Sequence, residues 1–297
     1  MAKLPVDESH QVQLAMRVPI NEMPLPLAGQ LKYNGCRITA VITDIDVAFK
    51  TRNSHQVLYP EMLASVRALG KYNCILDGEW CKGDSRGTNH TAITGRVNSA
   101  MKTGTPIPNN LGWVFNIFDY MSLDHWNNKN CPHDYRHRYS TLQNLLAECP
   151  FNNIAIAKTW DFNNHADIEA KYNELIALGY EGMIGKAWSS LYTHKKNKTW
   201  MKLKAEEPAD LLCTGWEGGK GKYTGMIGKL ICEGVVEGRE VKVGVGTGMT
   251  DADRARDPEY YLGNTIEIKY NEVCVDNRTG EWSLFLPVYV ATRLDKS

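Results

Sequence analysis

Apolar positions in the first two thirds of the chain switch between the patterns of strands and of helices. Strand-like segments, which alternate in polarity or run apolar with β-branched residues, cover 38–49, 73–82, 111–120 and 180–188. Between them, apolar residues recur on one helical face in 60–69, which opens with proline and stops at glycine, and again in 167–179. Strands interleaved with helices predict an α+β first domain.

After Pro208 the pattern changes to short strand candidates separated by glycine-rich turns. One helix-like insert, 251–261, interrupts them, and Gly238 stands in a tight-turn position between two valine-rich runs. Short strands around one helix predict a small closed or partly closed all-β barrel, with an OB-fold as the leading candidate. We therefore expect domains at 1–206 and 207–297. The strand candidates of the second domain are 210–216, 227–236, 239–245, 264–272 and 282–292.

The composition, with 43% hydrophobic and 23% charged residues over 297 positions, is that of an ordinary globular protein. No apolar run approaches the roughly 20 residues needed to cross a bilayer, so we expect no membrane partner. The eight cysteines include no C-x-x-C pair, which argues against a zinc ribbon or a redox dithiol and favours free thiols in a reducing cytoplasm.

Overall charge is balanced, with 34 basic and 34 acidic residues, so any nucleic-acid partner must be recognised by local clustering. The segment 182–205 holds six lysines and no acid, with Trp188, Tyr192 and Trp200 interleaved. Such a segment suits polyphosphate or a nucleic-acid backbone. A solvated lysine-rich loop is the alternative that this feature alone leaves open.

The sequence lacks the signature motifs of three common enzyme classes: P-loop NTPases, dinucleotide oxidoreductases and serine hydrolases. The chain has no G-x-x-x-x-G-K-[S/T] loop, no G-x-G-x-x-G between a strand and a helix, and no G-x-S-x-G elbow. What remains is a set of lysines and acids at strand edges, beginning with Lys32 in "QLKYNGCR", where Gly35 permits a close backbone approach. A lone lysine in such a turn is usually an exposed loop residue, and Phe118 on a buried strand is equally well a core aromatic.

Taken together, these segments resemble the covalent nucleotidyltransferases and, within them, the ATP-dependent DNA ligases of minimal two-domain phage or bacterial type. Family order and plausible spacing hold over nearly the whole chain, although Asn34 stands where the family usually has Asp. The matching segments are Lys32–Arg37 for K-x-D-G-x-R, Thr51-Arg52-Asn53, Asp77-Gly78-Glu79, Phe118-Asp119, Glu181–Lys186 for E-G-x-x-x-K, Lys202 and Lys204 for K-x-K, "GKGKYTGMIGKL", "VGTGMTDADR", and Arg293–Lys296 for R-x-D-K.

The resemblance implies an adenylation (nucleotidyltransferase) domain of antiparallel sheets and helices followed by a small OB-fold barrel. It implies that the protein seals 5′-phosphate/3′-hydroxyl nicks in duplex DNA, in repair or replication, through a lysyl-adenylate on Lys32 and a DNA-adenylate. A lysine amine attacks phosphorus only when neutral, a state that desolvation and neighbouring cations favour. Lysines on one strand face, such as Lys202 and Lys204, suit a clamp on phosphate charge.

The other roles also follow from the resemblance. Gln30 meets the base and Phe118 stacks on it, while Glu181 and Glu79 hold Mg²⁺ or Mn²⁺, or Glu79 binds the ribose instead. The remaining nucleotide-binding residues are Arg37, Lys186, Lys202, Lys204, Arg293 and Lys296. Arg52 meets the 5′-phosphate of the nick, and the further DNA-binding residues are Lys195, Lys196, Lys198, Lys220 and Lys222.

Three other functions stay open at this point. An RNA ligase or a messenger-RNA capping guanylyltransferase shares the lysine chemistry, and the loss of a negative charge at Asn34 suits a catalytically weakened nucleic-acid-binding module. For the ligase, we expect a monomer acting in the cytoplasm of a bacterium or of a phage-infected cell.

Overall fold

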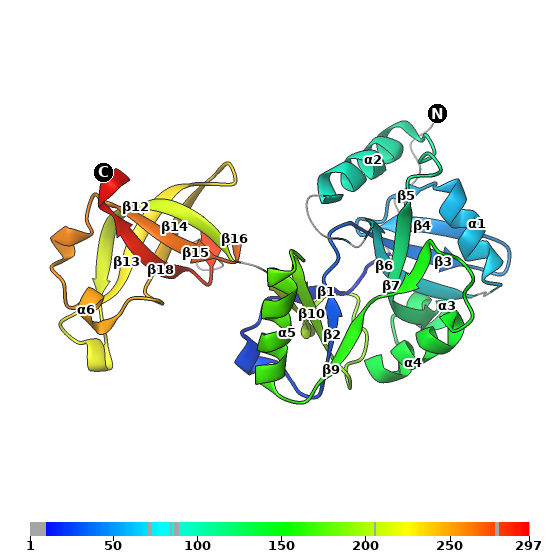
Figure 1. Ribbon diagram of the computed structural model, residues 1–297, viewed down its shortest axis with the longest axis horizontal. Helices are drawn as coiled ribbons and strands as arrows, with labels where there is room; N and C mark the ends of the chain where they lie inside the picture. The colour runs from blue at the N-terminus through cyan, green and yellow to red at the C-terminus, as the bar shows by residue number, and fades with distance from the viewer. Residues whose placement is uncertain are drawn as a thin grey trace. The chain divides into compact units, whose positions relative to one another are not determined.

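The computed structural model describes residues 10–70, 73–83, 85, 89–204, 206–276 and 279–296 (Figure 1). The chain divides into two units, Met1–Leu203 and Lys204–Ser297, three residues before the boundary expected from the sequence. Each unit is built around its own buried core.

One sheet of the first unit has the strand order β5-β4-β3-β6-β7-β8. The single strand expected over 38–49 is instead a hairpin, closed by the backbone N–H of Thr43 donating to the Asp46 carbonyl at 2.8 Å. The apolar pattern hides this turn because Ile45 at its tip is apolar although 89% exposed. The strands are β3 (Cys36–Ile42), β4 (Val47–Thr51), β5 (Gln56–Val57), β6 (Cys74–Lys82), β7 (Trp113–Ser122) and β8 (Ile154–Ile156).

The other sheet of this unit has the order β1-β11-β10-β2-β9. Its strand β2 is buried along its whole length and runs antiparallel to both of its neighbours, β10 and β9. Lys32 follows directly on the end of β2. The strands are β1 (Leu14–Met16), β2 (Leu27–Leu31), β9 (Thr159–Phe162), β10 (Gly182–Ala187) and β11 (Lys196–Lys204).

Helix boundaries in the first unit follow local capping chemistry. Pro60 opens α1 and Gly70, at φ +61°, follows its end. The side chains of Asp134 and Asn164 accept hydrogen bonds from the first turns of α4 and α5. The sequence pattern predicted α1 and α5 but not the helices between them. The helices are α1 (Pro60–Ala68), α2 (Asn89–Thr103), α3 (Leu123–Asn127), α4 (Tyr135–Leu146) and α5 (His165–Ala177), with a 3-10 turn η1 (Ile20–Glu22).

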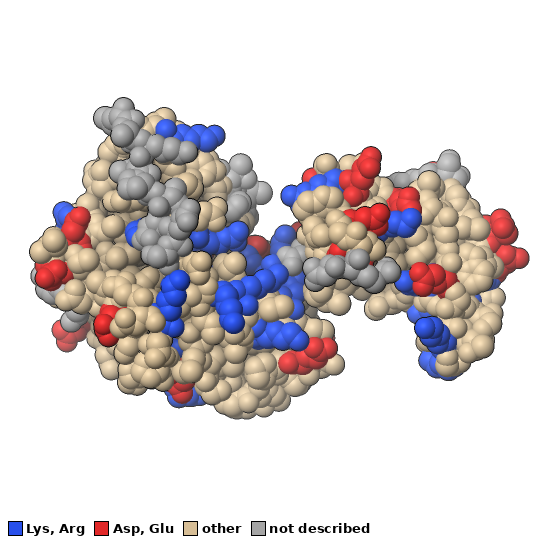
Figure 2. Space-filling model, turned by 180° about the vertical axis from the view of Figure 1, so that it is seen from behind, with Lys and Arg blue, Asp and Glu red and all other residues tan. Residues whose placement is uncertain are grey.

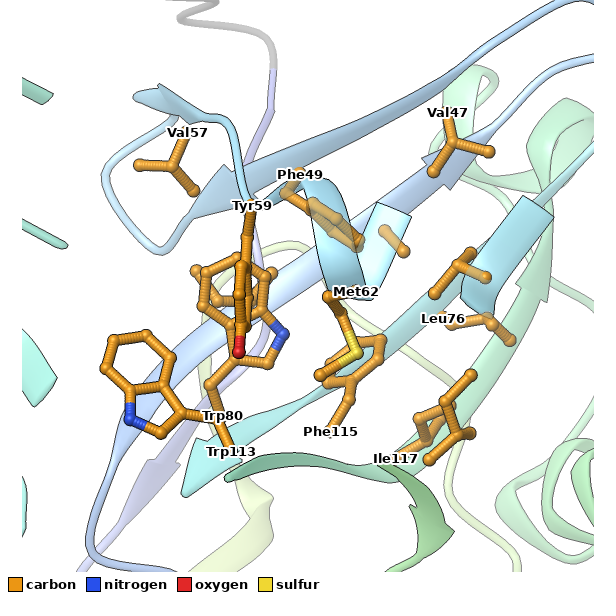
Figure 3. Packing of buried hydrophobic residues seen from close by; sticks show 14 of the residues in the cluster. Val47, Phe49, Val57, Tyr59, Met62, Leu76, Trp80, Trp113, Phe115 and Ile117 are labelled. Carbon is orange, nitrogen blue, oxygen red and sulfur yellow. The ribbon is translucent and has the colours of Figure 1, made fainter. Parts of the chain in front are cut away.

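A group of aromatic rings packs among aliphatic side chains in the core of the first sheet (Figure 3). Trp80 is edge-to-face with Phe49 and with Tyr59, at ring-centroid distances of 5.0 and 5.4 Å, an arrangement that adds to the stabilisation from burial. Because side chains alternate along a strand, β6 buries Trp80 in this core while Asp77 and Glu79 face the opposite side. The core thus fixes the strand that carries two candidate site residues.

The second unit holds a sheet of order β14-β13-β12-β15-β18 and a separate hairpin of β16 and β17. In the described residues its two edges meet through the bridge between Thr247 and Val288 rather than through a continuous ladder, so the barrel is only partly closed. The strand expected over 282–292 is split at Leu286, whose φ is +50°. The elements are β12 (Glu207–Gly218), β13 (Ile227–Val236), β14 (Arg239–Val245), α6 (Asp251–Arg254), β15 (Thr265–Tyr270), β16 (Glu272–Val275), β17 (Trp282–Phe285) and β18 (Val288–Arg293), with 3-10 turns η2 (Gly221–Tyr223), η3 (Pro258–Tyr260) and η4 (Leu294–Lys296).

Candidate active site

A pocket of about 130 Å³ lies between the two sheets of the first unit. Strand β2, the residues just after it, β10 and β11 contribute one side, while β3, β6 and β7 contribute the other. Its lining consists of Ala15, Gln30, Leu31, Lys32, Tyr33, Arg37, Glu79, Phe118, Ile184, Lys186 and Trp200. Six of the residues singled out from the sequence therefore meet at one place.

Lys32 is held at this pocket by its backbone and by its charge. Its N–H donates to the Gly182 carbonyl at 3.0 Å, and its amine forms an ion pair with Glu181, each side chain being 21% exposed. The following turn requires Gly35, because a Cβ there would lie 2.0 Å from the Trp80 carbonyl oxygen. Next to it, the backbone N–H of Asn34 donates to the Ser85 hydroxyl at 2.7 Å.

Glu79 and Arg37 enter from neighbouring strands, since they are direct partners across β6 and β3. Burial raises the pKa of Glu79 to about 7, against the opposing effect of the Lys32 and Arg37 charges, and the nearby Glu181 raises it further. Arg37 is fixed by Asp77, to which its Nε and Nη2 donate at 3.0 and 2.6 Å. The pocket thus combines a carboxyl that titrates near neutrality with a permanently charged guanidinium.

A β-bulge aims Phe118 into the pocket. Along β7, Ile117 pairs with Gly78 and Asp119 pairs with Asp77, so Phe118 between them has no partner in the ladder. Its ring stands edge-on to Trp200 at a centroid distance of 6.0 Å. Asp119 beside it forms a buried ion pair with Arg138, at 2.9 Å from Arg138 Nε.

Lys186 lies inside a cage of aromatic rings and is 1% exposed. Its amine is 3.9, 4.4 and 4.5 Å from the ring centroids of Trp200, Phe118 and Tyr135, and it donates to the Phe118 carbonyl at 3.1 Å. Burial lowers the pKa of Lys186 to about 7, although the charges of Asp119 and Asp77 raise it. Its charge is therefore sensitive to pH near neutrality.

We expect Lys186 to make the stability of the first unit rise with pH. The folded chain holds this proton less tightly than the unfolded chain, whose lysine keeps the ordinary pKa of 10.5, so unfolding takes up a proton between pH 7 and 10.5. The free energy of unfolding then gains up to about 1.4 kcal/mol per pH unit in this window. Urea unfolding at pH 7, 8, 9 and 10 measures the free energy of unfolding of the wild type and of Lys186→Met. The value for Lys186→Met minus that for the wild type should fall as pH rises, and a constant difference would contradict a lowered pKa of Lys186.

Two buried polar atoms at this pocket have no hydrogen-bond partner within the described part of the chain: Gln30 Oε1 and Trp200 Nε1. Buried polar groups are normally hydrogen-bonded. One acceptor and one donor on pocket-lining side chains therefore fit a polar ligand rather than an apolar one.

The lysines of the K-x-K pattern are not part of the lining. Lys202 and Lys204 are half-buried on β11, and the Lys204 amine lies 3.5 Å from Glu207. They share the strand face of Trp200, two residues earlier, which does line the pocket.

Two of the predicted DNA-binding residues, Arg52 and Lys195, meet in a separate depression of about 440 Å³ together with His194. Lys196 and Lys198 are exposed on the start of β11. Figure 2 shows Lys and Arg side chains gathered on one face of the first unit. The depression joins segments more than 140 positions apart in the sequence.

In the second unit, the predicted residues lie around the turn η2, at the end of β18 and in η4. Lys220 and Lys222 are exposed around the turn η2. Arg293 forms ion pairs with Asp295 at 2.8 Å and with Glu267 at 3.2 Å. The side chain of Lys296 lies outside the described part of the structure.

Sequence reasoning did not assign Ile184, Tyr33 or Tyr135 to a nucleotide pocket, and it named Trp200 only as an aromatic residue interleaved with the lysines of 182–205. A signal existed for two of them: Ile184 shares a strand face with Lys186, and Trp200 shares one with Lys202, because every second residue faces the same way. Tyr135 carried no such signal, since its position depends on how α4 packs against β7.

Comparison with protein families decides the relationship. The family model of the ATP-dependent DNA ligase domain matches residues 12–204. The chain belongs to the ATP-dependent DNA ligase family. The model of the DNA ligase OB-like domain matches residues 218–278. The expected fold class, an α+β adenylation domain followed by an OB-like domain, is thereby confirmed.

Curated DNA ligases show the same relationship in sequence. Those of Natronomonas pharaonis and Thermococcus fumicolans are each 26% identical to this ligase-family chain, over 91% and 93% of it and over 52% and 53% of their own lengths. The chain spans about half the length of the curated relatives it matches.

Solved ligase structures show the same fold. A structure of Lig E DNA ligases has a TM-score of 0.57 and 21% identity, covering 96% of this chain and 99% of that one. The ATP-dependent DNA ligase of bacteriophage T7 in complex with ATP has a TM-score of 0.57 and 19% identity over the same shares. Among the described helices of this ligase-family chain, none is long and apolar enough to cross a membrane.

Proposed function

We propose that the protein is an ATP-dependent DNA ligase that seals nicks with 5′-phosphate and 3′-hydroxyl ends. The observation that carries the proposal is the convergence of Lys32, Glu181, Glu79, Arg37 and Phe118 around one pocket, from strands of two different sheets. The order of these residues along the chain is that of the family motifs.

In this proposal, the nucleotide base lies against Phe118 with its polar edge at Gln30, whose Oε1 lacks a partner among the described residues. Arg37 binds the ribose or a phosphate, and Lys186 meets the nucleotide from its aromatic cage. Lys202 and Lys204 extend the positive charge along β11 toward the phosphates. Membership of the family supports ATP as the nucleotide.

Glu181 and Glu79 fit a magnesium or manganese ion. Mg²⁺ takes one or two protein carboxylates and completes its shell with water and phosphate oxygens, and these two carboxyls are close enough for one to raise the pKa of the other. The ion would neutralise charge on the reacting phosphate. Because Glu181 forms an ion pair with Lys32, an ion held there would lie beside the proposed nucleophile.

The reaction proposed for Lys32 has three balanced steps. Its neutral amine bonds to the α-phosphorus of ATP and releases a proton as the bond to pyrophosphate breaks, giving a lysyl-adenylate. A 5′-phosphate oxygen of the nick then takes the AMP as the P–N bond breaks and the amine takes up a proton. Finally, the 3′-hydroxyl attacks that 5′-phosphate, loses its proton and releases AMP. Arg293 and Lys296 at the end of the chain are proposed to orient the leaving pyrophosphate in the first step.

For DNA, we propose that Arg52 receives the 5′-phosphate of the nick, with Lys195 beside it. Lys196 and Lys198, and Lys220 and Lys222 in the second unit, contact neighbouring phosphates. Exposed lysines suit this role because each releases counter-ions from the duplex when it neutralises a phosphate.

Salt dependence measures these contacts. Removing two phosphate contacts with Lys195→Ala and Lys198→Ala is expected to lower the slope of log K against log salt by about 1.8 for nicked duplex binding. The measurement is a fluorescence-anisotropy titration between 50 and 200 mM salt. A double variant of Lys102 and Lys269, exposed lysines outside this set, should keep the wild-type slope, and equal slopes for all three proteins would remove these residues from the interface.

A sealing assay tests the whole proposal. Purified protein, Mg²⁺ and ATP should join a nicked DNA duplex with a 5′-phosphate and leave a 5′-hydroxyl nick open. Faster sealing of a nicked RNA strand would favour an RNA ligase, and adduct formation with GTP instead of ATP a guanylyltransferase. If no covalent nucleotide forms with either, the protein is a nucleic-acid-binding module, and Asn34→Asp shows whether position 34 is the cause.

The proposal also includes a monomer in the cytoplasm of a bacterium or a phage-infected cell. The cytoplasmic part of the proposal is supported by the eight cysteines, all within the described ranges and all free, since reducing compartments keep thiols unpaired.

A further inference from the structure

The side chain of Gln30 ends in an amide, which can present either an acceptor or a donor to a base. We propose that Thr159 acts as a positioning residue that fixes the Gln30 amide with its oxygen toward the pocket and so selects adenine over guanine. The inference rests on the proposed function, since it concerns the base subsite of the same pocket.

Thr159 is the direct cross-strand partner of Gln30 in the β2–β9 pair. Gln30 Nε2 donates to Thr159 Oγ1 at 2.9 Å. The Thr159 hydroxyl donates its single hydrogen to the Ala157 carbonyl at 2.8 Å. Because that hydrogen is committed, Thr159 offers Gln30 only an acceptor, and only the amide nitrogen can face it.

Tyr135 reinforces the same orientation from α4. Its hydroxyl donates to the Phe118 carbonyl at 2.8 Å, so its oxygen is also left as an acceptor. Burial raises the pKa of Tyr135 well above its ordinary value, and its hydrogen bond with Gln30 acts in the opposite direction, as expected when the amide donates to the phenol oxygen. Tyr135 therefore favours the same orientation of the Gln30 amide as Thr159 does.

The remaining amide atom is Gln30 Oε1, which is buried and has no partner in the described part of the chain. Gln30 is 2% exposed and lines the pocket, and a buried acceptor is normally hydrogen-bonded, so a donor on a ligand in the pocket suits this oxygen. The 6-amino group of adenine is such a donor. Guanine presents a carbonyl oxygen at the same position, which would place two acceptors against each other.

Rotating the Gln30 amide to suit guanine would break the hydrogen bonds that link Gln30 to Thr159 and Thr159 to Ala157. The amide oxygen would then face Thr159 Oγ1, and that hydroxyl would have to leave the carbonyl of Ala157, a residue only 1% exposed. A buried acceptor without its donor costs more than an ordinary hydrogen bond contributes. These hydrogen bonds therefore fix the Gln30 amide so that it presents an acceptor to the pocket. The local sequence around Gln30 does not reveal this orientation.

The first test compares ATP with GTP in covalent labelling of the protein. Thr159→Val keeps the size of the side chain but removes its hydroxyl, and it should lower the ATP-over-GTP ratio of adduct formation by about tenfold, the worth of one hydrogen bond of roughly 1.4 kcal/mol. Thr159→Ser should restore the ratio. Thr103→Val removes an exposed helix hydroxyl that also donates to a carbonyl and should leave the ratio unchanged.

The Gln30→Glu variant distinguishes a positioning role of Thr159 from a merely structural one. A carboxylate offers an acceptor in both orientations, so adding Thr159→Val to Gln30→Glu should no longer change the ATP-over-GTP ratio. A merely structural Thr159 would lower labelling with both nucleotides equally and leave the ratio intact in either background, which would overturn the inference.

Nucleotide analogues test the wild-type protein without any substitution. If the amide is locked, inosine triphosphate, with an oxygen at position 6, should label the protein less than purine riboside triphosphate, which has no substituent there. If the amide rotates freely, inosine triphosphate will be the better of the two, and the inference fails. A wild-type protein that forms no adduct with ATP, GTP or either analogue would instead defeat the proposed function itself.

Discussion

Replacing Lys32 with alanine should abolish the covalent adduct with AMP. Of the two lysines among the described residues that line this pocket, Lys186 is enclosed by aromatic rings and donates to the Phe118 carbonyl, whereas Lys32 is partly exposed beside Glu181. Intact-protein mass spectrometry after incubation with ATP and Mg²⁺ should show the added mass of AMP on the wild type and none on Lys32→Ala. Loss of the nucleophile is expected to reduce adduct formation by a factor on the order of 10⁴ or more.

Lys102→Ala provides the matched control, since Lys102 is an exposed lysine on α2 away from the pocket lining. It should be labelled as fully as the wild type. Peptide mapping that places the AMP on a different side chain would remove Lys32 from its proposed role while leaving the fold and family intact.

Asp119→Ala is expected to cause the largest loss of stability, about 3–5 kcal/mol, because it leaves a buried charge without its partner. Asp119 and Arg138 are each 2% exposed in their side chains, and Arg138 also donates to the His133 and Ser190 carbonyls. Urea unfolding followed by tryptophan fluorescence measures the effect, since the core of this unit contains several buried tryptophans.

An exposed ion pair gives the comparison for this prediction. Arg67 and Asp46 form a contact in which the side chains are 53% and 62% exposed, and such pairs contribute about 0–1 kcal/mol. Asp46→Ala should therefore change the free energy of unfolding several times less than Asp119→Ala. Similar losses for the two variants would contradict the importance assigned to burial.

The sequence predicted those elements whose pattern is set by burial on one face. The helices at α1 and α5 and the strands at β6, β7 and β10 fall close to their predicted ranges. The sequence pattern did not predict turns that interrupt an apolar run. Ile45 and Leu286 are apolar residues at positions where the chain changes direction. The sequence pattern treats apolar residues as buried strand positions. Ile45 and Leu286 are apolar but exposed, so the pattern did not mark the turns.

Site residues were predictable where strand alternation or a motif marked them, and not where long-range pairing decides. Nothing local to Phe118 shows that it is skipped by the ladder with β6, because the bulge is a property of two strands together. Thr159 carries no signal either, since its relevance depends on its cross-strand position beside Gln30. Contacts between distant segments were the missing information.

The bulge at Phe118 also bears on how this pocket tolerates changes in chain length. The register on either side is regular, with Ile117 opposite Gly78 and Asp119 opposite Asp77, so a chain lacking residue 118 can form an uninterrupted ladder. Such a chain keeps the partners on which its sheet depends and loses only the ring that faces the pocket. In this strand, one codon separates a sheet that merely folds from a sheet that also presents an aromatic ring to the pocket.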